Sequence, residues 1–491
     1  MKKDMHWYDY LTINSYWLGL NMASGIITPI LLPYLVLLFM PPEQKNTYFA
    51  TIRVVSLAVA MLVQPLAGML SDRSTSRFGR RRPYIVVGAF FNVLILIIVG
   101  MSPSFIGAAS DGFFRQAFGV TTPYVVLLVG IVVLQVSSNV AHGALQGLIP
   151  DIVPEHQRGR ASGVKAVFEL IPVFLVLFIG PLVDAGKVGL VVGIICAGFV
   201  LTTLTTVLFV HEAPLREKPV EGIGEAALRL VFLTAIFVTV TRFATWLVTA
   251  SSDIVTARDV VLEVQIAFVG FVGLIAMAGA ILVGVYLGAW VGIGAEARQQ
   301  KSFIWWIVNR LLFLAAVGSV QSFAQYYLAD VLHVPKPASA TTMLMAAVAG
   351  FLIPSALGGG YLADRIGRKR LVMLAGLVAA GGTVVLLFAS TMPVVIVGGC
   401  IIGLGAGTFM ATNWALGTDL APKQDAGRYL GISNLAGAGA GIVGAGLGGP
   451  MADFFNALQP GLGYLVIFAL YAALFVLSSL TLSRVKLPTG A

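Results

Sequence analysis

The chain has 491 residues, of which 58% are hydrophobic and only 11% are charged, and its mean hydropathy is +0.91. A soluble protein of this length could not hide that much apolar surface from water, so the composition argues against a soluble enzyme and predicts a membrane protein. The formal net charge of +9 does not indicate nucleic-acid binding. Most Lys and Arg residues fall in short loops between apolar runs, where positive charge orients membrane proteins.

Apolar runs long enough to cross a bilayer follow one another along the whole chain. A transmembrane helix needs about 20 apolar residues, each rising 1.5 Å. With breaks placed at charges, Pro and Gly, we expect about fourteen spans. They are 13–39, 47–71, 84–104, 122–149, 162–184, 188–210, 227–251, 261–292, 303–329, 340–363, 371–391, 394–418, 427–449 and 461–483.

The distribution of positive charge predicts the orientation of these spans. Most Lys and Arg residues outside the spans lie in loops on the same side as both chain ends, and few lie in the opposite loops. Positive residues accumulate on the cytoplasmic side of short membrane loops. We therefore expect a multi-pass protein of the cell (inner) membrane with both termini in the cytoplasm.

A basic loop occurs once in each half of the chain. The first has Gly-Met-Leu-Ser-Asp-Arg at residues 68–73 and Gly-Arg-Arg-Arg-Pro at 79–83. The second has Gly-Tyr-Leu-Ala-Asp-Arg at 360–365 and Gly-Arg-Lys-Arg at 367–370. A loop found in corresponding places of two halves indicates two homologous helix bundles.

A second motif repeats with identical spacing. Asp-x-x-Pro-x4-Gly-Arg begins at Asp151 and again at Asp419, each time after the second helix that follows the basic loop. Matching the repeats leaves 227–251 and 261–292 without counterparts, which predicts six plus two plus six helices. The expected domains are an N-terminal six-helix bundle at 1–210, a linker with an inserted transmembrane hairpin at 211–302, and a C-terminal six-helix bundle at 303–491.

The duplicated Gly-x-x-x-Asp-Arg loop with its run of arginines resembles the loop signature of the major facilitator superfamily. Residues 63–83 read Val-Gln-Pro-Leu-x-Gly-x-x-Ser-Asp-Arg-x-x-Ser-Arg-Phe-Gly-Arg-Arg-Arg-Pro, which is similar to sucrose transporters and to glycoside–pentoside–hexuronide cation symporters. The resemblance implies an all-α polytopic fold in which two bundles rock about a central site. It implies a secondary transporter of a sugar or another small polar solute, and no enzyme.

The basic loops are expected to act as gates. Asp72 and Asp364 each end an apolar helix with a carboxylate within reach of the arginines that follow. Such ion pairs can hold one conformation and break in the other. The alternative is that the arginines only anchor the topology. The expected gating residues are Gly68, Asp72, Arg73, Gly79, Arg80, Asp151 and Arg160 in the first half and Gly360, Asp364, Arg365, Gly367, Arg368, Asp419 and Arg428 in the second.

Polar side chains inside spans indicate where a solute binds, because they are costly in lipid and usually face a cavity or another helix. The fourth span carries four of them at a spacing that places all on one helical face. The superfamily resemblance implies that the first, fourth, seventh and tenth core helices line the pathway. Hydrogen bonding between helices without any cavity is the alternative. The expected binding residues are Asn21, Gln135, Asn139, His142, Gln146, Gln321, Gln325, Asn413 and Trp414.

The same residues suggest the charge of the solute and the site of coupling. Sucrose transporters carry an Asp and an Arg in the fourth span, and the aligned positions here hold Gln135 and Gln146, so we expect a neutral or weakly charged solute. Glu169 in the fifth span is the candidate for proton coupling, because a buried carboxyl has a raised pKa. A structural pair with Lys165 is equally open. His142 is the second candidate.

No residue cluster indicates catalysis, a metal site or a cofactor. The Gly-x-G-x-x-Gly pattern at 439–444 lies inside an apolar span without the strand that a dinucleotide site requires. The expected partners are the lipid bilayer, a small-molecule solute and protons, with no nucleic acid. Two alternatives remain: a non-transporting assembly or scaffold factor that docks through 227–292, and a drug or lipid efflux carrier. The polar faces favour transport, because a scaffold needs no polar centre.

Overall fold

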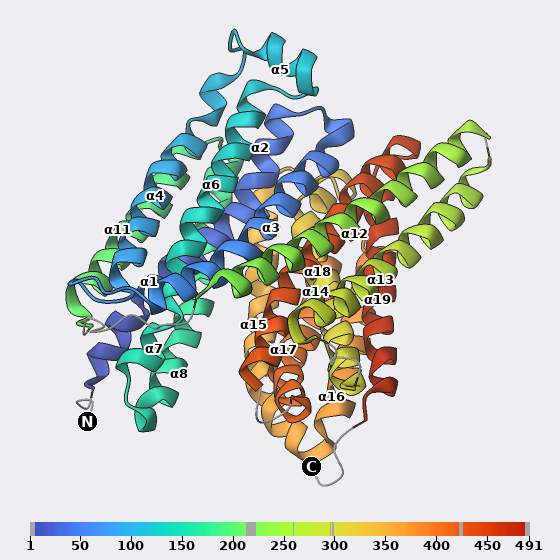
Figure 1. Cartoon of the computed structure of the whole chain (residues 1–491). Coiled ribbons are helices and arrows are strands. Elements are labelled where there is room, and N and C mark those ends of the chain that lie inside the picture. The colour runs from blue at the N-terminus through green and yellow to red at the C-terminus, as the bar shows by residue number, and fades with distance from the viewer. Residues whose placement is uncertain are drawn as a thin grey trace. The chain divides into compact units, whose positions relative to one another are not determined.

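The computed structural model of the chain describes residues 5–212, 222–258, 260–294, 296, 299–421 and 426–486, without the side chains of 426–432 and 434–436. Within these residues every element of regular secondary structure is a helix, and there is no strand. Contacts divide the chain into two compact units (Figure 1). The N-terminal unit comprises Met1–Met40 and Val59–Leu228, and the C-terminal unit comprises Pro41–Ala58 and Arg229–Ala491.

The helices that begin in the N-terminal half form the following series. They are α1 (Trp7–Ile26), the π-helix η1 (Ile27–Leu31), α2 (Leu32–Phe39), η2 (Pro42–Gln44), α3 (Lys45–Asp72), α4 (Arg82–Gly100), η3 (Ser102–Phe105), α5 (Asp111–Phe118), α6 (Thr122–Leu145), α7 (Leu148–Ile152), η4 (Glu155–Gln157), α8 (Arg158–Leu170), α9 (Pro172–Leu175), η5 (Val176–Phe178), α10 (Gly180–Asp184) and α11 (Val188–Phe209). The boundary between the units passes through α3, whose first turns belong to the C-terminal unit.

The remaining helices are longer and fewer. They are α12 (Gly224–Ala257), α13 (Leu262–Ile293), α14 (Lys301–Asp330), α15 (Pro337–Ile366), α16 (Arg368–Leu387), α17 (Met392–Leu420), α18 (Ala426–Leu458), α19 (Leu462–Thr481) and the short 3₁₀ helix η7 (Leu482–Arg484). All of them except the first turn of α12 belong to the C-terminal unit.

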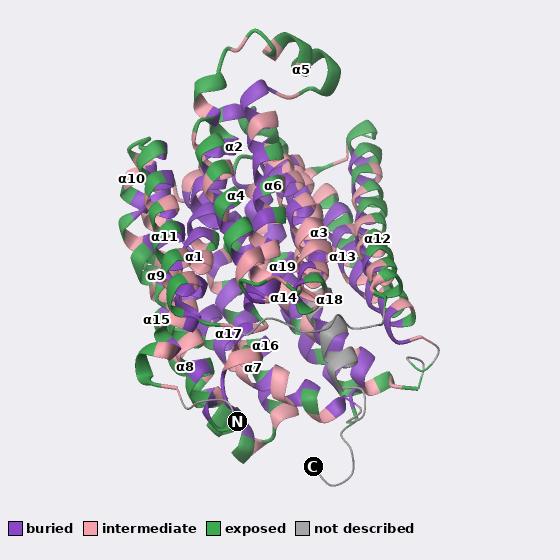
Figure 2. Cartoon of the chain, turned by 60° about the vertical axis from the view of Figure 1, so that its left-hand side comes forward, coloured by how far each residue is buried: buried purple, intermediate pink, exposed green. Residues whose placement is uncertain are grey.

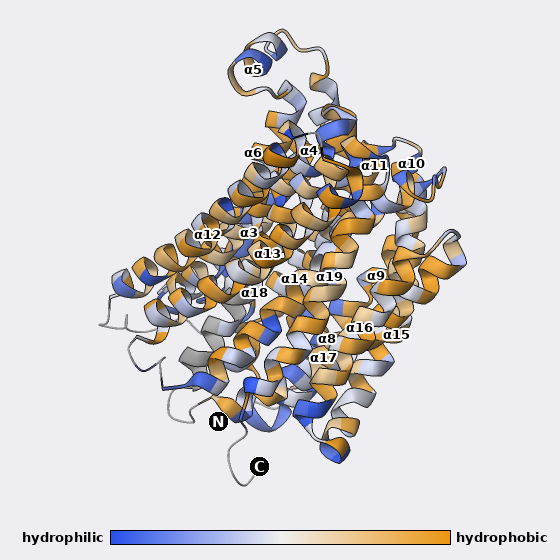
Figure 3. Cartoon of the chain, turned by 90° about the vertical axis from the view of Figure 1, so that its right-hand side faces the viewer, coloured by the Kyte–Doolittle hydropathy of each residue, from blue (hydrophilic) through white to orange (hydrophobic). Residues whose placement is uncertain are grey.

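The prediction of an all-α polytopic membrane protein is confirmed. Within the described residues, 13 helical segments are long and apolar enough to cross a membrane. In chain order they match all the expected spans except 427–449. That remaining span lies within the continuous helix α18. Figure 3 shows apolar colour along most of the helices and polar colour mainly at their ends and in the connections. This distribution is the one that a bilayer requires.

Two spans of the N-terminal unit are interrupted. The first changes from α1 to the π-helix η1, and the fifth is divided among α8, α9, η5 and α10. Proline explains the break in the fifth span, because Pro172 and Pro181 have no N–H group to donate to the preceding turn. The two interruptions are neighbours, since η1 packs on α10 and α1 packs on α9 and η5. Such irregular segments often lie at functional sites.

Small residues allow the helices of each unit to pack closely. In the N-terminal unit α4 packs between α6 and α11, and a methyl group on Gly88 would come within 2.6 Å of the Ser137 carbonyl. In the C-terminal unit α17 packs between α15 and α16, and a methyl group on Gly405 would come within 2.7 Å of the Ala375 carbonyl. Figure 2 shows buried residues along the packed helices, whereas α5 has none. Close backbone approach at small residues is a common way to pack membrane helices.

Helices α12 and α13, which the sequence predicts to be an inserted hairpin, pack within the C-terminal unit (Figure 1). Helix α13 packs on α14, α18 and α19. Phe237 of α12 lies over Gly284 of α13 and Gly439 of α18, where added methyl groups would approach its ring to 2.7 and 2.5 Å. Helix α12 is therefore held against α13 and α18 by contacts between an aromatic ring and glycines, and not only by its chain connections.

Candidate functional site

The polar residues of the fourth span lie on one face of α6. Gln135 and His142 are partly accessible, Gln146 is exposed and Asn139 is buried. Asn139 Nδ2 donates to the Gln135 backbone carbonyl at 2.8 Å and to its Oε1 at 3.1 Å. Gln146 Nε2 and His142 Nε2 lie 3.4 Å apart. The face keeps free hydrogen-bonding capacity, because each neutral amide has two donors and an acceptor.

Three helices converge beside this face. The rings of Trp17 on α1 and His142 on α6 meet edge to face with centroids 5.0 Å apart. Lys165 of α8 lies over the Trp17 ring at 4.0 Å, and its Nζ is 3.4 Å from the Glu169 carboxylate. Asn21, one turn after Trp17, donates to the Trp17 carbonyl at 2.9 Å. The candidates for coupling, Glu169 and His142, therefore lie around one cation and one indole ring.

The C-terminal unit has its polar cluster between α14 and α17. Arg310 Nη1 donates to Asn413 Oδ1 at 3.2 Å, and its guanidinium carbon lies 5.1 Å from the Trp414 ring centre. Asn413 Nδ2 donates to Asn309 Oδ1 at 2.8 Å, and Trp306 Nε1 donates to the Asn413 carbonyl at 3.0 Å. Asn413, expected to bind solute, is thus a fully buried support for Arg310.

The other expected residues of this unit divide by accessibility. Gln321 is exposed and Trp414 is partly accessible, whereas Gln325 is buried. On α14, which is otherwise mostly buried, the accessible positions include Arg310, Leu314 and Gln321. Their spacing places them on one face of the helix. Arg310, Gln321 and Trp414 therefore keep part of their surface uncovered by their own unit.

Arg81 connects the two carboxylates of the first basic loop region, Asp72 and Asp151. Its side chain is only 6% exposed and forms an ion pair with Asp72. Its Nε donates to Asp151 Oδ2 at 2.8 Å, and its Nη1 donates to Ser71 Oγ at 2.7 Å. Arg80 forms a second ion pair with Asp151. The end of α3, the start of α4 and α7 are therefore joined by one guanidinium, which can serve two carboxylates at once.

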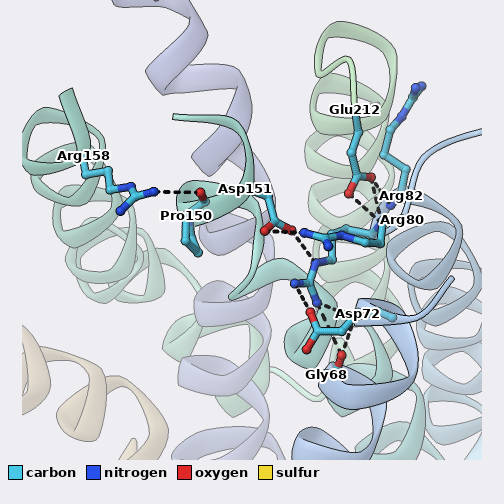
Figure 4. Close-up of polar contacts among 10 residues, drawn as sticks. Gly68, Asp72, Arg80, Arg82, Pro150, Asp151, Arg158 and Glu212 are labelled. Atoms are coloured by element: carbon cyan, nitrogen blue, oxygen red, sulfur yellow. Dashed lines mark hydrogen bonds and ion pairs between the residues drawn. The ribbon is translucent and has the colours of Figure 1, made fainter. Parts of the chain in front are cut away.

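The carboxylate of Glu212, three residues after the end of α11, lies at the start of α4. Its Oε2 accepts from the Arg81 N–H at 2.7 Å and from the Arg82 N–H at 3.3 Å (Figure 4). These N–H groups belong to the first turn of a helix and lack partners within it. Gly79 has φ +103°, and a methyl group there would come within 2.6 Å of Glu212 Oε2. Burial raises the pKa of the Glu212 carboxyl above its ordinary value, although the two N–H groups lower it.

The second basic loop repeats part of this arrangement. Arg368 Nη1 lies 2.6 and 2.5 Å from the two carboxylate oxygens of Asp419. Asp151 and Asp419 begin the same sequence motif, so an arginine of each basic loop pairs with an equivalent aspartate. Asp364 differs from Asp72: among the described residues it has no hydrogen bond or ion pair.

The remaining residues expected to gate are dispersed around these pairs. The Gly68 carbonyl accepts from Arg81 Nη1 at 3.4 Å. Arg365 lies over the Tyr361 ring at 4.4 Å, and Gly367 ends α15 with φ +89°. Arg73 and Gly360 lie beside these groups in sequence, Arg160 is exposed, and the side chain of Arg428 lies outside the described residues. Both ion-pair groups join helices within their own unit.

A comparison with known families decides the identity of the fold. The family model described as Major Facilitator Superfamily matches residues 17–445 and 307–490. The chain belongs to the major facilitator superfamily. Within the described residues, no three His, Cys, Asp or Glu side chains could together hold a metal ion.

Several curated members of this superfamily resemble the chain. Sucrose transport protein SUC4 of Arabidopsis thaliana is 25% identical over 380 residues, which are 68% of this chain and 72% of that protein. Sucrose transport protein SUC3 of the same plant is 25% identical over 43% of this chain and 38% of its own length. The minor myo-inositol transporter IolF of Bacillus subtilis (strain 168) is 32% identical over 30% of this chain and 32% of its own length. The chain thus spans well under half of two of these relatives.

Solved structures of the superfamily share the fold. The nucleoside transporter NupG superposes with a TM-score of 0.65 at 11% identity, covering 97% of this chain and 99% of that one. The D-xylose–proton symporter superposes with a TM-score of 0.62 at 14% identity, covering 97% of both chains. At these identities the likeness concerns the fold alone.

Three candidate residues of this major facilitator protein are absent from the binding and gating residues expected from the sequence. Arg81 and Glu212 connect the basic loop to the helix ends, and Arg310 is the cation of the α14–α17 cluster. Arg81 lies inside a run of three arginines, in which the sequence does not distinguish the buried one. Arg310 could have been singled out as a charge in the first half of an apolar span.

Proposed function

We propose that the chain is a secondary active transporter that moves a small polar organic solute of the sugar class across a membrane by alternating access. Membership of the superfamily and the curated sucrose and inositol transporters among its relatives support this proposal. The chain is a multi-pass membrane protein with helices for both halves of the fold.

The observation that carries the proposal is the accessible polar face on helices of each unit. In the N-terminal unit, α6 presents Gln135, His142 and Gln146. In the C-terminal unit, α14 presents Arg310 and Gln321. A face turned toward lipid would be apolar, because unpaired polar groups are costly there. Amides beside indole rings suit a solute that has hydroxyl groups and apolar C–H faces.

Neither alternative function has such support. A scaffold or assembly factor needs no accessible polar face on its helices. A drug or lipid efflux carrier would be expected to present a mostly apolar binding surface. The named curated relatives are transporters of sucrose and inositol.

The orientation and the gating follow from the same proposal. The excess of Lys and Arg in the loops on the side of both termini favours a cytoplasmic location for those loops in a cell membrane. The ion pairs of Arg81 with Asp151 and of Arg368 with Asp419 would then fix the cytoplasmic helix ends of each unit. Rearrangement of these pairs accompanies the switch between conformations.

The test is uptake of labelled sucrose, myo-inositol, xylose and simple glycosides into proteoliposomes, with and without an imposed proton gradient. We expect saturable uptake of at least one of these solutes by the protein, and none by protein-free vesicles. No uptake of any solute by protein shown to be folded would contradict the sugar class.

Proton coupling at Glu169 is tested in the same vesicles. Glu169 and the His142 ring lie beside the same Lys165 and Trp17 side chains, and this proximity supports a role in coupling. In Glu169→Gln we expect uptake that no longer rises with the gradient but still exchanges labelled for unlabelled solute. Exchange and gradient-driven uptake lost together would instead indicate a structural role for the pair. His142→Gln separates the second candidate by the same two measurements.

A further inference from the structure

Arg310 is an uncompensated charge inside a membrane helix. It lies nine residues after the start of α14, which is about 14 Å along the helix axis. Its Nε atom is shielded from solvent and has no hydrogen-bond partner. Of the five N–H donors of the guanidinium, only the Nη1 bond to Asn413 is formed among the described residues, and no carboxylate there lies within ion-pair distance.

The guanidinium is held in place although its charge is not neutralised. Asn413 receives its hydrogen bond and is itself fixed by Asn309, which donates to the Ser478 carbonyl at 2.8 Å. Asn309 and Asn413 are both completely buried. Indole rings flank the cation, with the Trp414 centre 5.1 Å and the Trp306 centre 6.0 Å from the guanidinium carbon. One edge of the planar group is therefore occupied and its orientation is set before any ligand arrives.

A preoriented arginine with free donors recognises a planar anion. Arginine–carboxylate pairs are often bidentate, with two parallel N–H···O bonds, and they are stronger than bonds between neutral groups. A buried or half-buried cation without a counter-charge is energetically costly. An anionic ligand therefore binds here with a more favourable free energy than a neutral one. The single positive charge of Arg310 matches a monoanion better than a phosphate dianion.

We infer that Arg310 binds the carboxylate of the transported solute, which is a sugar acid rather than a neutral sugar. This inference rests on the proposed transport of a sugar-class solute. The carboxylate pairs with the terminal N–H donors of Arg310 that Asn413 leaves unused, and the accessible Trp414 ring receives an apolar C–H face of the sugar. The neutral amides that replace charges in the fourth span therefore do not make the solute neutral.

The experiment compares matched pairs of sugars that differ only in one carboxylate. Purified protein in lipid nanodiscs is titrated with glucuronate and glucose, and with galacturonate and galactose, at pH 7 while tryptophan fluorescence is recorded. For the wild type we expect each uronate to bind roughly tenfold more tightly, or better, than its parent sugar, as for a hydrogen-bonded charge pair. In Arg310→Gln the uronate is expected to lose more affinity than its parent sugar, so that the preference for the uronate disappears.

Two further variants keep the test decisive. Arg310→Lys retains the charge without the planar fork and is expected to retain part of the preference. Arg242→Gln removes an exposed arginine from the middle of another apolar helix, α12, and is expected to leave the preference unchanged. If Arg310→Gln does not fold, the wild-type ratio and Arg310→Lys decide.

Three results would overturn the inference. They are equal binding of uronate and parent sugar by the wild type, an unchanged preference in Arg310→Gln, and tighter binding of glucose 6-phosphate than of glucuronate. Uptake in proteoliposomes separates this failure from failure of the proposed function. Uptake of neutral sugars without preference for acids removes only the role of Arg310, whereas no uptake of either removes sugar transport itself.

Discussion

Asp453 of α18 caps the first turn of α3, although its partners Asn46 and Thr47 lie more than 400 residues earlier in the chain. Its carboxylate accepts from the Thr47 N–H at 2.7 Å, from the Asn46 N–H at 3.2 Å and from Asn46 Nδ2 at 2.8 Å. Lys45 beside them pairs with Asp330 of α14 at 2.6 Å. The first turn of α3 is thereby fixed within the C-terminal unit, and its last residue, Asp72, pairs with Arg81 in the N-terminal unit.

Asp453→Ala is expected to destabilise the protein. It removes the acceptor for two N–H groups of a helix start, a loss that typically costs ~1–2 kcal/mol, and it leaves the buried amide of Asn46 with fewer partners. The measurement is the unfolding temperature of the purified protein in detergent. Asp253→Ala is the control, since Asp253 is exposed on α12. Equal unfolding temperatures for the two variants would contradict the capping role.

Arg81→Ala is expected to be more harmful than the same change at Arg77 in the same loop. Arg81 is almost buried and serves Asp72 and Asp151, whereas Arg77 is exposed. Removing one partner of a buried ion pair lowers the free energy of unfolding, here by up to about 3 kcal/mol. The loss is limited because Asp151 keeps its ion pair with Arg80. Folded yield and unfolding temperature measure the difference. A variant of Arg77 as damaging as that of Arg81 would mean that total loop charge matters and the buried network does not.

Glu212 predicts a specific dependence of stability on pH. Its pKa is raised in the folded protein, chiefly by burial, so the folded state holds this proton more tightly than the unfolded state. The contribution to stability is therefore fully present below the ordinary pKa of Glu and is lost as the pH rises through the raised value. Glu212→Gln removes this dependence, so the wild type is expected to lose stability relative to the variant between acid and neutral pH.

Unfolding temperatures of both proteins, recorded across that range, measure the Glu212 effect. A wild-type advantage that grows toward neutral pH would have the opposite sign and would contradict the raised pKa. Glu225→Gln, at the start of α12, serves as a carboxylate control outside this contact.

The two aspartates of the second basic loop region are expected to differ in transport. Asp419 pairs with Arg368 through both oxygens, whereas Asp364 is exposed without a described partner. Because the Arg368–Asp419 pair is partly exposed, its loss is expected to cost less than about 1 kcal/mol of stability. The initial rate of uptake is the more sensitive measurement. We expect a several-fold lower rate for Asp419→Asn and a nearly normal rate for Asp364→Asn. The reverse order would indicate that Asp364, and not Asp419, is the gating aspartate.

The sequence determined the helices and the internal repeat. Hydropathy and helix length are local properties, and a bilayer admits few alternatives to a helix for an apolar run. The spacing of Gln135, Asn139, His142 and Gln146 likewise fixed their common face, since a helix places such positions together whatever surrounds it. The equivalence of Asp151 and Asp419 is also visible in the sequence, because each begins the same motif.

Only the tertiary structure decided which charges meet. Three consecutive arginines look alike in sequence, yet the fold buries Arg81 between two carboxylates and leaves its neighbours more accessible. Asp364 has the motif of Asp72 but no ion pair with another described residue, and Asn413 supports Arg310 from the buried side. Partners such as Glu212 and Asp453 come from distant helices, and their pairing depends on burial and on packing over hundreds of residues. Local periodicity therefore determines the secondary-structure elements. Desolvation in the packed fold determines which of their charged side chains are paired with one another.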